Sequence, residues 1–387
     1  MATRMTPFEL MEKLVSFPTV SRDTNIPLID WVEGYLSGHG IESHRYIDPE
    51  QPKHALFAHV GPWQEGAVVL SGHTDVVPVD GQPWDTDPFS VVEKDGRYYG
   101  RGTCDMKGFD ALALWALVEA SYMTLKTPLQ VALSFDEEIG CTGAPPMIKA
   151  MQPVLPKGKS AIIGEPSNMQ AVTGHKGGSG FHTHVVGFEV HSSLLHKGVN
   201  AIMAGAKLIE WANEQNSISM AAKPTELASM FEPPFTTVHV GMIEGGTAHN
   251  ITAKDCKFGL DFRVVPGEDK EKWKLAYLKE VERVEKQMQA VVPQTRIEIS
   301  PRFDVPPLEP EKNGPAETLV RQITGDNASH KVSYGTEAGQ FQEAGYSAVI
   351  CGPGDIAQAH QPNEFIEISQ FNAGHEFMKK LLTRLST

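Results

Sequence analysis

The chain has 387 residues, of which 41% are hydrophobic, and a formal net charge of −14 at pH 7. This length exceeds what one hydrophobic core usually serves, so we expect two domains. The acidic balance argues against nucleic-acid binding, which needs a basic face. No window approaches the ~18 consecutive apolar residues of a membrane span, and residues 1–12 contain acids but no apolar segment typical of a secretory signal.

Four cysteines are scattered along the chain without CxxC spacing: Cys104, Cys141, Cys256 and Cys351. This pattern predicts reduced thiols in a cytoplasmic protein rather than a disulfide framework. Cys104 adjoins an aspartate and is either a metal ligand or a small buried thiol, and the second interpretation is favoured.

Helical and extended patterns alternate through the first part of the chain. The expected elements are two helices, a strand pair, a strand, an apolar buried helix and two strands, in the order 8–15, 28–36, 46–60, 67–71, 107–123, 129–135 and 160–164. Such alternation is typical of a mostly parallel sheet, so we predict an α/β fold.

The pattern changes after residue 172. The glycine-rich stretch 174–180 predicts a hinge. The elements expected next mix alternating strands with helices, at 181–187, 200–213, 236–242, 254–264 and 269–289. A strand at 295–299 either completes this α+β insert or returns to the first domain. The first pattern resumes after a connector, with elements at 317–324, 347–351 and from 369. We therefore predict a first domain of residues 1–177 and 295–387 around an insert of residues 178–294.

Acidic or histidine side chains stand where several predicted strands end. They are His73, Asp75, the run Asp136-Glu137-Glu138, and Glu165, with Asp105 in a glycine-rich turn before the buried helix. Each one alone is better explained as a helix cap or an ion-pair partner. Together they predict one crevice, because ligands of open α/β sheets bind at the carboxyl ends of the strands. A histidine with several carboxylates suits Zn²⁺, or Mn²⁺ or Co²⁺ in the same geometry.

Five segments resemble the M20 family of di-zinc amidohydrolases, and they are residues 72–78, 102–108, 136–140, 164–166 and 358–362. The resemblance covers nearly the whole chain, in the family's order. It implies a two-domain α/β fold, in which a di-zinc metallopeptidase-like catalytic domain carries an inserted α+β domain. The insert is implied to act as a lid and to form the contact between the subunits of a homodimer.

The resemblance also implies roles for individual residues. The implied ligands of two zinc ions, or of cobalt or manganese in their place, are His73, Asp105, Glu138, Glu165 and His360. Asp105 is implied to bridge the two ions, with His73 and Glu165 on one and Glu138 and His360 on the other. Glu137 is implied as the general base, and Asp75 as the residue that holds the His73 ring. A cis peptide bond is implied after Asp105.

Within the family, segments 335–341 and 352–360 most resemble the subfamily that hydrolyses N-acetyl-L-ornithine to L-ornithine and acetate in arginine biosynthesis. Four residues are implied contacts of this small N-acyl amino acid: Lys176, Asn250, Arg263 and Glu337. Arg263 matches the family's substrate-carboxylate arginine, and its alternative is a surface ion pair with Asp261. Asn250 is otherwise a turn residue, and Glu337 either pairs with the substrate ammonium or is a structural acid.

His191 matches the family's lid histidine, which enters the active site of the partner subunit. Its alternative is a structural histidine that caps the following helix. Three other functions stay open, namely hydrolysis of N-succinyl-diaminopimelate, hydrolysis of dipeptides, and binding by a catalytically dead paralogue. The segment 174–177 contains one certain cation, Lys176, whereas the succinyl-cleaving relatives are usually arginine-rich there. This difference favours a neutral acyl group.

Overall fold

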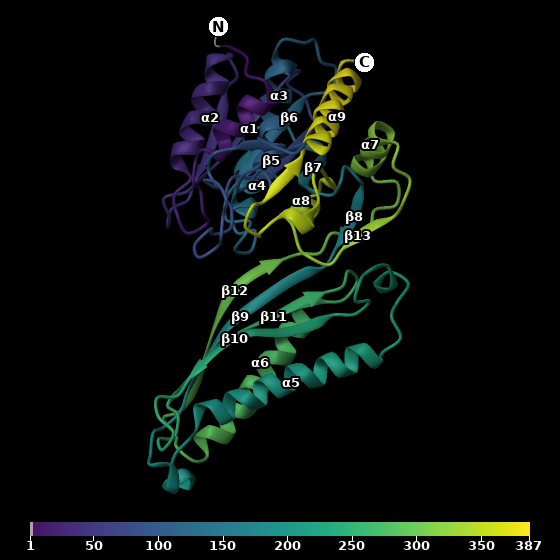
Figure 1. Cartoon of the computed structure of the whole chain (residues 1–387). Coiled ribbons are helices and arrows are strands. Elements are labelled where there is room, and N and C mark those ends of the chain that lie inside the picture. Colours follow the sequence, from purple (N-terminus) through teal and green to yellow (C-terminus); the bar gives the residue numbers. More distant parts are fainter. Residues whose placement is uncertain (1–2) are drawn as a thin grey trace. The chain divides into compact units, whose positions relative to one another are not determined.

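A computed structural model describes residues 3–387 of the chain. The described chain forms two compact units (Figure 1). Unit 1 contains the chain up to Gly174 together with Leu308–Lys331 and Thr336–Thr387, and unit 2 contains His175–Pro307 and Val332–Gly335. Unit 2 is thus an insertion in unit 1. Between residues 3 and 387, no helix is both long and apolar enough to cross a membrane.

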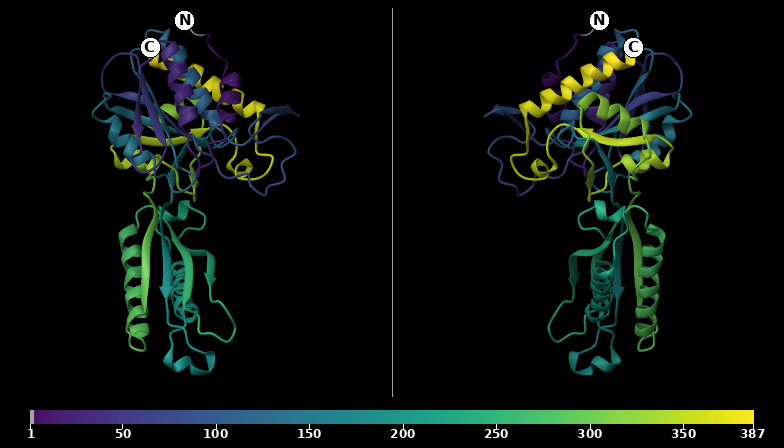
Figure 2. Two further views of the ribbon diagram at one scale, coloured as in Figure 1. Left: turned by 90° about the vertical axis from the view of Figure 1, so that its left-hand side faces the viewer. Right: turned by 90° about the vertical axis from the view of Figure 1, so that its right-hand side faces the viewer.

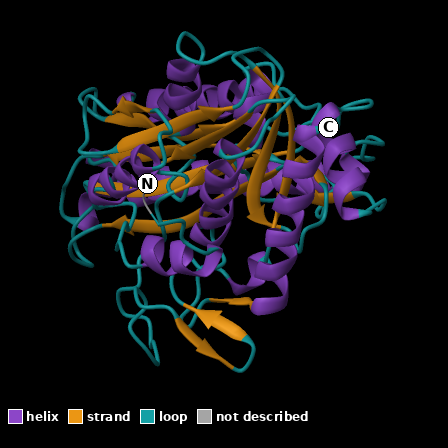
Figure 3. Ribbon diagram, turned by 90° about the horizontal axis from the view of Figure 1, so that it is seen from above, coloured by secondary structure: helices purple, strands orange, loops and turns teal. Residues whose placement is uncertain are grey.

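The centre of unit 1 is an eight-stranded sheet with the order β1-β2-β6-β3-β7-β14-β8-β13. In chain order its strands are β1 (Ser43–Ile47), β2 (His54–Val60), β3 (Ala67–His73), β6 (Leu129–Ser134), β7 (Gly158–Pro166), β8 (Val172–His175), β13 (His330–Val332) and β14 (Ser347–Gly352). The four central strands β6, β3, β7 and β14 are parallel, so their carboxyl ends lie along one edge. Figure 3 shows these strands side by side between helices.

Seven α-helices of unit 1 cover this sheet: α1 (Pro7–Val15), α2 (Ile26–Gly38), α3 (Lys107–Ser121), α4 (Ala144–Met151), α7 (Pro315–Thr324), α8 (Ala338–Glu343) and α9 (Ile368–Ser386). Helices α1, α2, α3, α7 and α9 share one apolar core with alternate residues of the strands, such as Leu56 and Leu133. Their neighbours Phe57 and Ala132 are also buried and point to the opposite face, where α4 packs. Figure 2 shows α9, in yellow, lying beside α3.

Burial on both faces explains the nearly continuous apolar runs of the central strands. The helix predicted at 107–123 is α3, and it is buried on almost every side, as expected. A small three-stranded sheet, in the order β15-β5-β4, was not predicted. Its strands are β4 (Val92–Lys94), β5 (Arg97–Tyr99) and β15 (Phe365–Glu367). They are too short to show a periodic pattern.

Unit 2 is an antiparallel sheet with two long helices on one of its faces. The strand order is β10-β11-β9-β12, from β9 (Gly177–Val186), β10 (Thr237–Gly245), β11 (Asp255–Val264) and β12 (Arg296–Val305). Helices α5 (Ala201–Ala221) and α6 (Lys270–Gln289) form a core with the inward side chains of β11, such as Leu260 and Phe262. Two short 3₁₀ helices, η1 (Ser192–Lys197) and η2 (Ala228–Met230), complete the unit. The predicted α/β fold with an α+β insert is confirmed.

One predicted boundary is wrong. The return to unit 1 comes at Leu308 and not at residue 295, because β12 pairs with β9 along its length and so belongs to unit 2. The stretch 174–180, predicted as a hinge, begins at the boundary between the two units, and its glycines from Gly177 onward lie within β9. A side chain at Gly178 or Gly180 would meet the Phe303 ring at 2.9 or 2.7 Å, so these glycines make room for that ring.

Candidate active site

The carboxyl edge of the central sheet of unit 1 gathers the acids and histidines singled out above. His73 is the last residue of β3, the run Asp136-Glu137-Glu138 follows β6, and Glu165 lies near the end of β7. His360 follows β14 in a loop with a short 3₁₀ turn, η3 (Ile356–Gln358). Asp105 precedes α3, and its peptide bond to Met106 is cis. The edge of one sheet thus brings residues from five distant segments together.

Asp105 lies between the two histidines. One of its carboxylate oxygens is 3.2 Å from His73 Nε2, and the other is 3.2 Å from His360 Nε2. On the first side, Glu165 Oε1 is 3.9 Å from His73 Nε2. On the second side, Glu138 Oε2 is 2.9 Å from His360 Nε2. The donors therefore form two groups that share one aspartate.

Asp75 connects the His73 side of this cluster to the Glu137–Glu138 turn. The His73 Nδ1 atom is 2.9 Å from the Asp75 carbonyl oxygen and 3.5 Å from its carboxylate. The same carboxylate accepts hydrogen bonds from the Ser21 hydroxyl at 2.7 Å and from the backbone N–H groups of Glu137 and Glu138 at 3.2 and 3.3 Å. A histidine whose one nitrogen is fixed in this way presents the other nitrogen, Nε2, to the cluster.

The electrostatics of the cluster call for additional positive charge. Burial, together with the nearby Asp105 carboxylate, raises the pKa of Glu138 to about 8 and raises the pKa of Glu165 well above its ordinary value. Hydrogen bonds to Asp105 and Glu138 raise the pKa of His360 to about 11. Among residues 3–387, the buried atoms Glu138 Oε1 and Glu165 Oε1 have no hydrogen-bond partner.

Buried polar atoms in native proteins almost always have partners, and buried carboxylates need a compensating charge. Imidazole and carboxylate donors are ligands that zinc accepts. Ligand atoms of His73, Asp105 and Glu138 lie within 4.8 Å of one another, and so do those of His73, Glu137 and Glu165. The donor set therefore fits divalent metal ions.

Comparison with known proteins agrees with this chemistry. Residues 69–384 match the model of peptidase family M20/M25/M40. An acetylornithine deacetylase of Myxococcus xanthus is 36% identical over 365 residues, which cover 92% of either chain. The chain belongs to the M20 family. Its fold is also similar to that of an M20 family metallo-carboxypeptidase from Sulfolobus solfataricus, with a TM-score of 0.79, 18% identity and 99% of either chain covered. A dinuclear metal-binding M20 peptidase from Bacillus subtilis gives a TM-score of 0.64 with 14% identity and 98% of either chain covered.

Glu137 stands beside the cluster of this M20 chain. Its carboxylate accepts a hydrogen bond from the Cys141 thiol at 3.1 Å. Burial is the main cause that raises the pKa of Glu137. The nearby Asp105 charge raises this pKa further, and His73 opposes the increase. A carboxyl group whose pKa lies above the ordinary value is better suited to accept and return a proton near neutral pH.

Glu337, the remaining predicted site residue of unit 1, is buried at the start of α8. The Ser134 hydroxyl donates a hydrogen bond to its carboxylate, and burial raises the Glu337 pKa to about 8.

The other predicted contacts of this M20 chain belong to unit 2. The buried Lys176 ammonium donates to the carbonyl oxygens of Pro233 and Phe235 at 2.7 and 2.9 Å. Asn250 is exposed in the loop after β10. The Arg263 guanidinium is 3.9 Å from the Asp261 carboxylate, which is too long for a hydrogen bond. Its Cζ lies 5.8 Å from the centre of the Phe303 ring.

His191 is exposed and precedes η1, where its Nδ1 accepts a hydrogen bond from the Ser193 backbone N–H at 3.3 Å. The capping interaction proposed as the alternative role is therefore present. It uses only one ring nitrogen. The Ser193 hydroxyl lies 2.8 Å from the same Nδ1, so both contacts leave Nε2 as the ring nitrogen available for a further partner.

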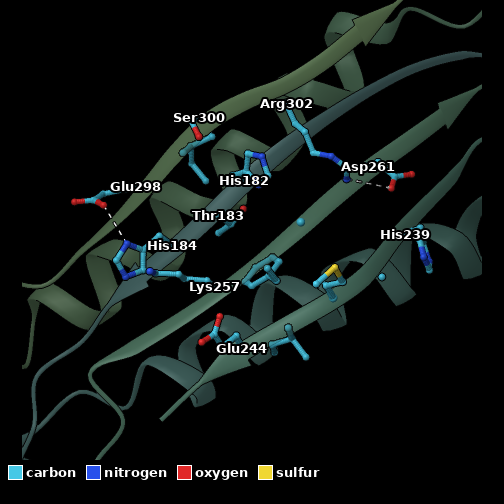
Figure 4. A pocket seen from close by; sticks show the side chains of 16 residues that line it. His182, Thr183, His184, His239, Glu244, Lys257, Asp261, Glu298, Ser300 and Arg302 are labelled. Atoms are coloured by element: carbon cyan, nitrogen blue, oxygen red, sulfur yellow. Dashed lines mark hydrogen bonds and ion pairs between the residues drawn. The ribbon is translucent and has the colours of Figure 1, made fainter. Parts of the chain in front are cut away.

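Unit 2 also has a hollow of about 870 Å³ on the open face of its sheet (Figure 4). His184 lies there between two acids, with Nε2 2.7 Å from Asp255 and Nδ1 3.2 Å from Glu298. Arg302 lies 4.0 Å from Asp261. The residues that line this hollow are all from unit 2, whereas the acid and histidine cluster is built from unit 1.

Two residues that sequence reasoning missed hold the Asp105 turn. Arg101 and Glu364 form an ion pair at 2.7 Å, and each side chain is 1% exposed. Glu364 follows His360 by only four positions, and Arg101 precedes Asp105 by four. This proximity in sequence to two candidate ligands was the one signal that could have identified Arg101 and Glu364 from the sequence.

Proposed function

We propose that this chain is a metal-dependent amidohydrolase that converts N-acetyl-L-ornithine to L-ornithine and acetate, a step of arginine biosynthesis. One observation carries the proposal. The cluster around Asp105 brings all six expected metal and base residues together in a chain 36% identical to an acetylornithine deacetylase. Because none of the six is missing, a catalytically dead binding protein is disfavoured.

Two divalent ions, zinc by default and cobalt or manganese as alternatives, are proposed cofactors. Asp105 is the proposed bridge, His73 and Glu165 the ligands of one ion, and Glu138 and His360 those of the other. The two groups of donors on either side of Asp105 support this assignment. When bound, such ions stabilise negative charge on the acyl oxygen and make the attacking water more acidic.

Glu137 is proposed to move the proton. An amide resists hydrolysis because its resonance must be broken and its amine must leave in protonated form. The Glu137 carboxylate accepts the proton of the attacking water and then donates it to the leaving nitrogen. The raised pKa of Glu137 supports both halves of this role. Asp75 holds the backbone of the Glu137–Glu138 turn in place through two N–H hydrogen bonds.

Arg263 is proposed to bind the substrate carboxylate. A guanidinium matches a carboxylate with two parallel hydrogen bonds, and Arg263 is not held by a hydrogen bond to Asp261. We therefore expect Arg263→Lys, which keeps the charge but loses the fork, to raise KM for N-acetylornithine by about tenfold. The KM increase should be at least as large as the decrease in kcat, as measured by steady-state kinetics.

Arg302→Lys is the matched control for this substitution. Arg302 also lies beside Phe303 and near Asp261, at 4.0 Å, on strand β12, which β9 separates from the β11 strand of Arg263. Its replacement should leave KM within the error of the assay. Unchanged kinetics of the Arg263→Lys variant would exclude Arg263 from substrate binding.

Glu337 is proposed to pair with the ammonium group of the substrate, and Asn250 and Lys176 to assist binding. Lys176 already donates to two carbonyl oxygens. Its ammonium thus holds the backbone at Pro233 and Phe235, and Lys176 is proposed to assist binding through that backbone rather than by pairing with an acyl carboxylate. This supports a neutral acyl group over the carboxylate of a succinyl group.

A homodimer in the cytoplasm is proposed as the working form. Strand β10 is an edge strand of the unit 2 sheet and exposes Met242 and Ile243, which are 81% and 55% exposed. Exposed apolar edge strands readily pair with another chain. The four cysteines are free thiols, which supports a reducing compartment.

The proposed substrate is tested by parallel assays of the zinc-loaded protein on N-acetyl-L-ornithine, N-succinyl-diaminopimelate and a panel of dipeptides. We expect kcat/KM to be highest for N-acetyl-L-ornithine, by at least about tenfold. If activity is highest on either of the other substrate classes, the substrate proposed here is wrong, but the assignment as an amidohydrolase stands. Zinc-loaded protein without activity on any of the three classes would contradict the proposal as a whole.

A further inference from the structure

The Arg101–Glu364 pair lies directly beside the Asp105 turn. One Glu364 oxygen accepts the Arg101 hydrogen bond at 2.7 Å. The other accepts three backbone N–H groups, from Gly102 and Cys104 at 3.0 Å and from Asp105 at 3.1 Å. A buried carboxylate with four donors is fully paired, and each of its three backbone bonds fixes a residue of the turn that presents Asp105.

The same pair reaches His360 in the other direction. The second Arg101 nitrogen, Nη2, donates to the Gln82 side-chain oxygen at 2.6 Å. The Gln82 amide nitrogen then donates to the backbone carbonyl of His360 at 3.1 Å. The Trp84 indole also donates to the Gln82 oxygen, at 3.1 Å, and its ring lies 5.0 Å from the Arg101 guanidinium. A continuous polar chain therefore joins the Asp105 backbone to the His360 backbone.

His360 needs such support. Its φ of 63° lies in the left-handed region, which is uncommon for residues other than glycine. Backbone of this kind persists when surrounding contacts fix it. The His360 side chain is 53% exposed, so side-chain packing holds it only in part. Its backbone bond to Gln82 supplies a contact that does not depend on the ring.

We propose that Arg101, Glu364 and Gln82 are positioning residues that set the separation of Asp105 from His360. They touch neither the substrate nor the reacting atoms. Their effect is on the geometry of the two side chains assigned to the same metal ion, and so on the affinity of that ion. The inference rests on the proposed function, because it takes Asp105 and His360 as metal ligands.

Zinc titration of the metal-free full-length protein tests this role, with the bound zinc measured by elemental analysis after dialysis against chelator-buffered Zn²⁺. The unsubstituted chain should bind two ions. Glu364→Gln keeps the shape but removes the charge. Because Glu364 holds the turn of Asp105, the proposed bridge of both ions, this substitution should weaken binding of both zinc ions by about 10–100-fold, as for other groups that orient metal ligands. Glu367→Gln is the matched control, because Glu367 also pairs with an arginine, Arg97, but contacts neither candidate ligand.

Gln82→Ala is the second variant, and it covers the case in which an unpaired buried Arg101 prevents folding of Glu364→Gln. Gln82 lies in a half-buried loop, so its removal should leave the circular dichroism spectrum unchanged. It should lower the affinity for one zinc ion and leave the affinity for the other unchanged. A general loss of stability would not produce this difference between the two ions. Gln64→Ala is its control, because Gln64 makes the same kind of bond to the Lys126 carbonyl, at 2.9 Å.

The possible outcomes separate this inference from the proposed function. If the unsubstituted chain binds two zinc ions and folded Gln82→Ala binds both with the same affinities, the positioning role is wrong and the proposed function stands. If the unsubstituted chain binds neither zinc nor, in the same titration, cobalt or manganese, the proposed function fails and this inference fails with it. Selective weakening of one ion in Gln82→Ala, without change in the two controls, supports the positioning role.

Discussion

Glu137→Gln is expected to reduce kcat for N-acetylornithine hydrolysis by at least 10²–10⁴-fold while the bound metal remains. The amide has nearly the shape of the carboxylate but cannot accept the proton of water. Glu137 is not among the proposed metal ligands, and the Asp75 bonds to the backbone of this turn do not depend on its side chain. The measurement pairs steady-state kinetics with the metal-to-protein ratio.

Glu138→Gln provides the contrast for this experiment. Glu138 adjoins Glu137 and is a proposed ligand, 2.9 Å from His360 Nε2. Its substitution should lower activity through loss of metal, and added zinc should restore part of it. Excess metal should not rescue Glu137→Gln. Near-normal turnover in that variant would exclude Glu137 as the base.

His191→Ala is expected to lower kcat by about 10²-fold or more without loss of metal. The proposed role is a hydrogen bond from Nε2 to the oxyanion of the tetrahedral intermediate in the partner subunit. The contacts with Ser193 support this role, because they engage Nδ1 and leave Nε2 available to meet the oxyanion. His196→Ala is a suitable control, since His196 is an exposed histidine of the same 3₁₀ helix.

Mixed dimers decide whether His191 acts in the partner's site. Inactive Glu137→Gln subunits are combined with inactive His191→Ala subunits, and subunit exchange is verified with differently tagged chains. If His191 acts across the dimer, each heterodimer contains one site with both defects and one with neither. Activity should then return to about a quarter of that of the unsubstituted enzyme in an equal, randomly exchanged mixture. Verified exchange without recovered activity would contradict the role across the dimer.

The strand ends explain how much of the site was predictable. His73 and Glu165 follow short apolar runs, and parallel strands bring such positions to one edge regardless of the distance between them in the sequence. His360 has no comparable pattern, because it follows a loop with a 3₁₀ turn rather than a strand. Only the family resemblance selected it among fifteen histidines.

Other features were hidden for physical reasons. Glu364 acts on the backbone N–H groups of Gly102, Cys104 and Asp105, and nearly every residue has such a group, so no side-chain pattern reveals the contact. The glycines at 178 and 180 were interpreted as flexible, yet they lie in a strand under the Phe303 ring. A sequence shows that a side chain is missing, but the reason depends on what occupies its place.

The insertion of unit 2 has a consequence for how the protein is made. Strand β14 pairs in parallel with β7, and all of unit 2 lies between them in the chain. A ribosome releases the amino-terminal strands first, so the central sheet remains without β14 until the insert has been synthesised. His360 and Glu364 emerge later still. A nascent chain therefore carries Asp105, Glu138 and Glu165 for some time before His360 is added, and the complete set of proposed metal ligands belongs only to the nearly finished polypeptide.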